Sequence, residues 1–181
     1  MNKRVNLISK EGDRGISSLY SGEQISKSSE RLEALGDLDE LVSVLGVARA
    51  HAQKKRIKEE LLDVQRKLFI AGSELATTDE KLKTLPSRVD HLFIENFEKQ
   101  VQRLHDDTAL NPGFIIPGNS ISAAYINHAR AIARRCERRA VRLFENKEIS
   151  NDNLLIFLNR LSVYLYLMVR FEDPETTMLK E

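Results

Sequence analysis

The chain has 181 residues, and its 41% hydrophobic and 30% charged content is ordinary for one soluble globular domain with a real core. Its 28 basic and 27 acidic side chains leave a net charge of +1, which argues against a general nucleic-acid binder, because such proteins concentrate a basic excess. A single cysteine, Cys136, excludes an intrachain disulfide, and the N-terminus lacks the apolar core of a secretory signal. We therefore expect a cytoplasmic protein with one domain over residues 1–181.

The first half of the chain predicts a loop followed by three helices. Residues 1–28 are rich in glycine, serine and lysine without helical periodicity, which is typical of an ordered loop. Leucines then recur every three or four residues from about Ser29 to Gln53, and similar apolar stripes follow over 57–75 and 89–104. This spacing places the apolar side chains on one face and predicts amphipathic helices.

The second half predicts two more helices. Residues 111–120 contain two prolines and two glycines, which favours an ordered loop. An amphipathic pattern covers about 122–145. The helix predicted over 152–171 is apolar nearly all round but interrupted by polar residues, which suggests a central position in the fold and no membrane span. Residues 173–181 are expected to form a flexible tail. Five helices with short loops predict an all-α fold, an antiparallel five-helix bundle with an ordered N-terminal loop.

The fourth predicted helix carries six arginines in the stretch "HARAIARRCERRAVRLFE". At 100° per residue, one arc of about 100° holds Arg130, Arg134, Glu137 and Arg138. The other arginines extend this charged side further round the helix. The opposite side forms the predicted core stripe, which consists of Tyr125, Ala129, Ile132, Cys136, Ala140 and Leu143.

Three explanations compete for this arginine face: a solvated surface, a grip on nucleic acid, or a pocket for a small polyphosphate. Any surface helix shows a charged face opposite an apolar one. However, this face is nearly all arginine instead of the usual mixture of lysine and glutamate. Arginine is suited to phosphate, because its planar guanidinium binds two phosphate oxygens at once. Like charges on adjacent turns also repel one another, which invites an anionic partner. The spacing alone favours the solvated surface and the phosphate site equally, and the solvated surface suits Arg139 and Arg142 better.

Four motifs occur along the chain in a fixed order. They are "GDRGISSLYSGEQISKSSERLEALGDLDELVSVLG", "FIIPGNS", "HARAIARRCER" and "FLNRLSVYLY". Together they resemble the ATP:cob(I)alamin adenosyltransferases of the propanediol-utilisation type over nearly the whole chain. The resemblance implies a five-helix bundle that assembles into a homotrimer with active sites between subunits. It also implies transfer of the 5′-deoxyadenosyl group of ATP to the cobalt of reduced cobalamin, with ATP, Mg²⁺, cob(I)alamin or cob(II)alamin and an electron-donating reductase as partners.

The resemblance implies a nucleotide site between the N-terminal loop and the last two helices. Glu137 would orient an arginine or the nucleotide, and Arg134 would act in catalysis. Residue type alone leaves alternatives open. The N-terminal segment would be a plain surface loop, Glu137 would form a surface ion pair, and Asn159 would be a buried amide. The nucleotide-binding residues so implied are Ser9, Lys10, Gly12, Ser17, Ser18, Lys27, Arg134, Arg135, Arg138 and Asn159.

The resemblance also implies a corrinoid site. Asp39 and Arg130 match a catalytic pair that the family joins across the subunit interface. Phe114 matches the aromatic residue that helps to displace the lower ligand of cobalamin, and Tyr166 stands where a phenylalanine is usual. From residue type alone, Asp39 would be a solvated aspartate and Phe114 a core residue.

The sequence also departs from the family pattern at Glu11, Gln24, Asn119 and Val163. Glu11 places a negative charge near the expected triphosphate, Gln24 stands where an arginine is common, and Val163 stands where an aspartate is usual. Asn119 replaces a glycine and is expected to take a positive φ, which asparagine tolerates. Transferase activity remains the preferred hypothesis. A non-catalytic ATP- or corrinoid-binding bundle is the alternative, and a nucleic-acid-binding bundle is the least favoured.

Overall fold

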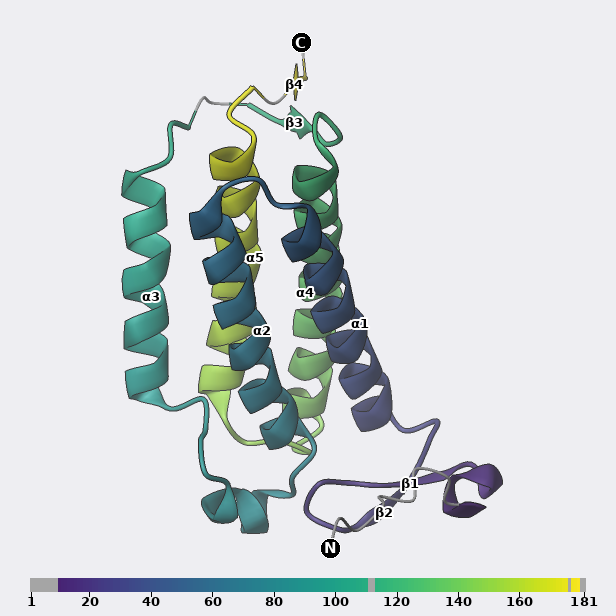
Figure 1. Cartoon of the computed structure of the whole chain (residues 1–181). Helices are drawn as coiled ribbons and strands as arrows, with labels where there is room; N and C mark the ends of the chain where they lie inside the picture. Colours follow the sequence, from purple (N-terminus) through teal and green to yellow (C-terminus); the bar gives the residue numbers. More distant parts are fainter. Residues whose placement is uncertain (1–9, 111–112, 176, 180–181) are drawn as a thin grey trace, which may run out of the picture.

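The computed structural model of the chain describes residues 10–110, 113–175 and 177–179. Five long helices lie side by side in one bundle, and successive helices run in opposite directions (Figure 1). The widest interfaces join α4 to α1 on one side and to α5 on the other. The all-α, five-helix prediction is confirmed. The helices are α1 (Glu30–His51), α2 (Lys55–Leu75), α3 (His91–Asp106), α4 (Ile121–Glu145) and α5 (Asp152–Glu172).

Polar caps begin most of these helices. A side-chain oxygen just before α1, α3, α4 and α5 accepts a hydrogen bond from a backbone N–H in the first turn, which lacks a partner within the helix. Such a cap stabilises a helix by about 1 kcal/mol. The helix starts are therefore set by local chemistry, at Ser29, Asp90, Ser120 and Asn151.

The core forms around α5. Phe157 and Tyr164 of this helix are fully buried, and the ring of Phe97 from α3 lies 5.0 Å from the first and 5.3 Å from the second, edge to face. Within the described part of the chain, α5 alone is long and apolar enough to span a membrane by length and composition. Because 61% of its apolar window is buried inside the bundle, it is the core helix here.

The N-terminal loop is ordered over its described part, as expected. It contains a short 3₁₀ helix, η1 (Lys10–Arg14), and a hairpin of β1 (Ile16–Ser18) and β2 (Gln24–Ser26). Its turn contacts a second 3₁₀ helix, η2 (Asp79–Thr84), because Lys81 lies 2.6 Å from Glu23. In Figure 1 the loop lies at the end of the bundle where α1 begins.

Two expectations about the chain's apolar and terminal residues are wrong. Tyr125 does not belong to the core stripe, because it is 38% exposed and its ring stacks against His51 on α1. Within the expected flexible tail, residues 177–178 are not free, because strand β4 (Thr177–Met178) pairs with strand β3 (Ile115–Ile116). The other members of the predicted stripe on α4 are buried, as expected.

Asn119 explains how this C-terminal strand is held. Its Oδ1 accepts a hydrogen bond from the Thr177 hydroxyl over 2.9 Å, and its Nδ2 donates to the backbone oxygen of Glu175 over 2.5 Å. Asn119 does not take the positive φ that the sequence suggested, because the neighbouring Gly118 does, at 129°. The glycine therefore makes the turn, and the asparagine side chain is free to bind the C-terminal segment.

Candidate functional site

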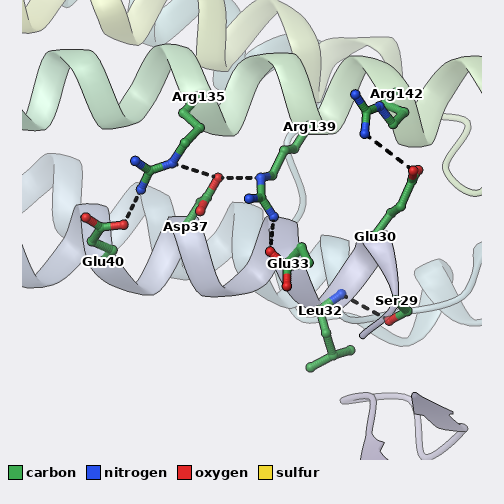
Figure 2. Close-up of polar contacts among 9 residues, drawn as sticks. All are labelled: Ser29, Glu30, Leu32, Glu33, Asp37, Glu40, Arg135, Arg139 and Arg142. Carbon is green, nitrogen blue, oxygen red and sulfur yellow. Dashed lines mark hydrogen bonds and ion pairs between the residues drawn. The ribbon is translucent and has the colours of Figure 1, made fainter. Parts of the chain in front are cut away.

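The structure divides the six arginines of α4 into two groups. Arg135, Arg139 and Arg142 face α1 and pair with its acidic residues (Figure 2). Asp37 lies at the centre of this contact, with its Oδ2 3.1 Å from Nε of Arg135 and 2.8 Å from Nε of Arg139. The Asp37 side chain is 10% exposed, so this bridge between two guanidiniums lies inside the seam between α1 and α4.

Further carboxylates of α1 extend this network along the helix. Arg135 also pairs with Glu40, and Arg139 also pairs with Glu33. The hydrogen bond with Glu33 raises the pKa of Arg139 above its ordinary value, so this arginine stays charged. The solvated-surface interpretation was wrong for Arg139, which has two partners. Arg142 lies at the exposed end, 3.5 Å from Glu30.

The second group forms a stripe along α4. Arg130, Arg134 and Arg138 are spaced by four residues, so they lie above one another on one face of the helix. Arg138 donates to the backbone oxygen of Arg134 over 3.1 Å, and Arg130 donates from Nε to Asn127 over 2.9 Å. Among the described residues, none of the three forms an ion pair with a carboxylate. We call these three residues the open stripe.

The edge of the open stripe toward α5 carries the one acid of this face. Glu137 accepts a hydrogen bond from Nδ2 of Asn159 over 2.7 Å, and Oδ1 of Asn159 accepts from Arg160 over 3.1 Å. Arg160 in turn lies 3.1 Å from Glu98 of α3. Asn159 therefore does bond to a neighbouring helix, but it is exposed rather than buried.

A cavity of about 340 Å³ lies at one end of the open stripe, under the loop before α4. It brings together three residues that the sequence predicted for the corrinoid side, Phe114, Arg130 and Tyr166. Phe114 is 79% exposed and is therefore not a core residue. Asp39 is exposed on α1 and is not joined to Arg130 within the chain. The other residues that line the cavity are Gly113, Ile115, Pro117 and Asn127.

The N-terminal loop holds its predicted residues apart from α4. Lys27 donates from Nζ to the backbone oxygen of Gly12 over 2.7 Å, which ties the start of the loop to its end. Gln24 borders an open hollow with Lys10, and Ser17 and Ser18 belong to β1. Ser9 and the side chain of Glu11 lie outside the described residues. In the described chain, no hydrogen bond or ion pair joins the loop to the open stripe.

The comparisons decide what this bundle is related to. A family model described as cobalamin adenosyltransferase matches residues 7–172. A corrinoid adenosyltransferase from Citrobacter freundii is 32% identical over 92% of this chain and 94% of its own length. The chain belongs to the cobalamin adenosyltransferase family.

Other relatives of this family agree in sequence and in fold. The corrinoid adenosyltransferase PduO of Citrobacter freundii is 34% identical over 93% of this chain, which spans about half (50%) of that relative's length. A solved variant of the PduO-type ATP:corrinoid adenosyltransferase from Lactobacillus reuteri, complexed with cobalamin and ATP, superposes with a TM-score of 0.85. It is 26% identical and covers 96% of this chain and 99% of its own.

Sequence reasoning missed the acidic partners of the arginine face. The four carboxylates of α1 are spaced by three, four and three residues, so they share one helical face, and that spacing was visible in the sequence. It was overlooked because their partners are about a hundred positions away, on α4. The acids are Glu30, Glu33, Asp37 and Glu40.

Proposed function

We propose that this adenosyltransferase uses the open stripe of α4 to hold the triphosphate of ATP while the adenosyl group passes to the cobalt of reduced cobalamin. The activity follows from its family, whose relatives carry the name corrinoid adenosyltransferase. The observation that carries the assignment of residues is that Arg130, Arg134 and Arg138 lack carboxylate partners among the described residues, whereas the other three arginines of α4 have them.

The reaction requires cations rather than a protein nucleophile. Cob(I)alamin is itself the nucleophile: its cobalt electron pair forms the bond to C5′ as the bond from C5′ to the triphosphate oxygen breaks. Negative charge therefore grows on the departing triphosphate, and preorganised cations aimed at it stabilise the transition state. Arg134 and Arg138 are the residues that we assign to the phosphate oxygens, which a planar guanidinium binds bidentately. Holding both substrates in line lowers the barrier further.

The cavity beside Phe114 is the proposed corrinoid side. Its aromatic rings, Phe114 and Tyr166, offer apolar faces to a corrinoid, and Arg130 joins this cavity to the open stripe. Asp39 would meet the Arg130 of a neighbouring copy in a homotrimer. We also propose that the protein works in the cytoplasm and that a partner reductase supplies the electron that reduces cobalamin. Light scattering that gives a trimer mass supports the shared site, and a monomer that is fully active contradicts it.

The nucleotide side is proposed to be completed by the N-terminal loop. Lys10, Gly12 and Lys27 would approach the phosphates, with Ser9, Ser17 and Ser18 as hydroxyl partners. Glu137 and Asn159 would border the nucleotide, and Arg135 would border it away from the triphosphate, because its guanidinium is already paired with Asp37 and Glu40. In the described part of the chain, no group of three or more metal-ligating side chains is present. We propose that Mg²⁺ enters with ATP, because this ion is commonly held through substrate phosphates.

The test is formation of adenosylcobalamin. The protein is incubated with ATP, Mg²⁺ and chemically reduced cobalamin, and the visible spectrum is followed. We expect conversion to adenosylcobalamin, and binding of both substrates without turnover would support a carrier instead. Arg134→Ala should abolish turnover while the circular dichroism and melting temperature stay unchanged, because Arg134 makes no ion pair in the described structure. The matched control is Arg103→Ala on α3, an exposed arginine away from the site.

A further inference from the structure

We infer that the acidic residues of α1 determine where the triphosphate binds, by neutralising the arginines of α4 that would otherwise hold it in the wrong place. This inference rests on the proposed function and gives the α1–α4 seam a part in it. The residues that act are Glu33 and Asp37, which occupy Arg135 and Arg139.

The charges on the two sides of α4 are unequal. In the seam, three guanidiniums face four carboxylates, so no positive charge is left over. On the open stripe, three guanidiniums are accompanied by one carboxylate, that of Glu137, which is already hydrogen-bonded to Asn159. An incoming polyanion is therefore attracted to the stripe and not to the seam.

The seam would be a competing anion site without its acids. It contains a cavity of about 380 Å³, lined by four arginines and two glutamates. One of these arginines, Arg138, also belongs to the open stripe, so the two positions adjoin each other. A triphosphate that slid into the seam would keep Arg138 but leave Arg134. The lining residues are Glu30, Glu33, Arg135, Arg138, Arg139 and Arg142.

Asp37 is the most important of these acids. It is the one buried carboxylate of the network, and it holds both Arg135 and Arg139 through Nε. Removal of its charge would leave two guanidiniums one turn apart with reduced compensation, and such a pair repels unless an anion binds between them. The substitution Asp37→Asn should therefore create a second place for phosphate.

The experiment measures binding of inorganic triphosphate by calorimetry, which needs no turnover. For Asp37→Asn we expect the Kd of triphosphate to fall about three- to tenfold, an effect that shrinks as salt screens the exposed charges. With ATP as the varied substrate, kcat should fall while KM falls or stays constant, because the added binding is unproductive. Asp37→Glu should restore the original values.

Controls separate this role from a purely structural one. Glu59→Gln makes the same change in net charge on α2, where the exposed Glu59 pairs with Lys55 of its own helix, and it should leave the Kd unchanged. The double substitution Asp37→Asn with Arg139→Gln should return the Kd to its original value. If Asp37→Asn does not fold, Glu33→Gln carries the test, because the Glu33 side chain is 54% exposed.

Two outcomes overturn the inference. A Kd for triphosphate that is unchanged or raised in a folded Asp37→Asn or Glu33→Gln variant means that these acids only fasten α1 to α4. A lower Kd that Glu59→Gln reproduces means that net charge alone is responsible. Failure of the proposed function looks different, since the unmodified protein would then form no adenosylcobalamin at all.

Discussion

Asn159 of α5 donates a hydrogen bond from Nδ2 to Oε1 of Glu137 on α4, over 2.7 Å. The amide is held in this orientation because its oxygen accepts from Arg160, which also pairs with Glu98 of α3. Three helices thus meet at the edge of the open stripe. The carboxylate of Glu137, the one acid on the face of the open stripe, is thereby tied to α5.

Substitution of Asn159 tests whether this contact orients the nucleotide site. Asn159→Ala should lower the free energy of unfolding by about 1 kcal/mol, since it removes a hydrogen bond to a carboxylate at a solvated position. It should also lower kcat/KM for ATP by about two- to tenfold, the usual effect of one lost hydrogen bond. Urea denaturation and steady-state kinetics with varied ATP measure the two effects.

The control for this substitution is Asn153→Ala, in the first turn of the same helix and away from Glu137. It should change kcat/KM for ATP little. Equal kinetic constants for Asn159→Ala and the unmodified protein would show that the amide only joins two helices.

Phe114 gives a prediction for the other substrate. Because this ring is 79% exposed, Phe114→Ala should change the free energy of unfolding by less than about 0.5 kcal/mol. It should nevertheless lower kcat/KM for cobalamin and leave KM for ATP unchanged, because the ring borders the cavity on the corrinoid side. Kinetics with each substrate varied in turn measure this difference.

A surface apolar residue of similar exposure provides the comparison. Leu92→Ala on α3, where the side chain is 62% exposed, should affect neither substrate. Equal losses for ATP and cobalamin in Phe114→Ala would contradict the assignment of this cavity to the corrinoid.

The sequence was sufficient for the helices because their determinants are local. Apolar residues at spacings of three and four specify the buried faces, and capping residues such as Ser29 and Asp90 specify the starts. The same geometry placed Arg130, Arg134 and Arg138 on one arc. Helical periodicity alone could therefore separate the open stripe from the core.

The rest depended on contacts between distant parts of the chain. The pairing of Asp37 with Arg135 and Arg139 joins residues on two helices, and nothing in either helix alone specifies it. The strand formed by Thr177–Met178 is equally non-local, because its partner strand precedes α4. Tyr125 was misplaced because a position on the edge of an apolar stripe can face either the core or a neighbouring side chain.

Cys136 gives a prediction about alkaline stability. Burial, assisted by the nearby charge of Asp37, raises the pKa of this thiol to about 12 from an ordinary value of 9.0. Between these values the folded protein keeps a proton that the unfolded chain loses. The free energy of unfolding should therefore fall as the pH rises through this range, by at most about 1.4 kcal/mol per pH unit from this group.

The variant Cys136→Ala should remove this part of the slope. Urea denaturation of both proteins at pH 8, 9 and 10, with a reducing agent present, measures the difference. The range stops at pH 10 because burial also raises the pKa of Tyr164 above its ordinary value of 10.0, so that this phenol adds its own loss of stability at higher pH. The two proteins should differ little in slope near pH 8 and most near pH 10. Parallel slopes throughout would mean that the thiol ionises equally in the folded and unfolded chains. The burial of Cys136, which is 2% exposed on the core side of α4, argues against that result.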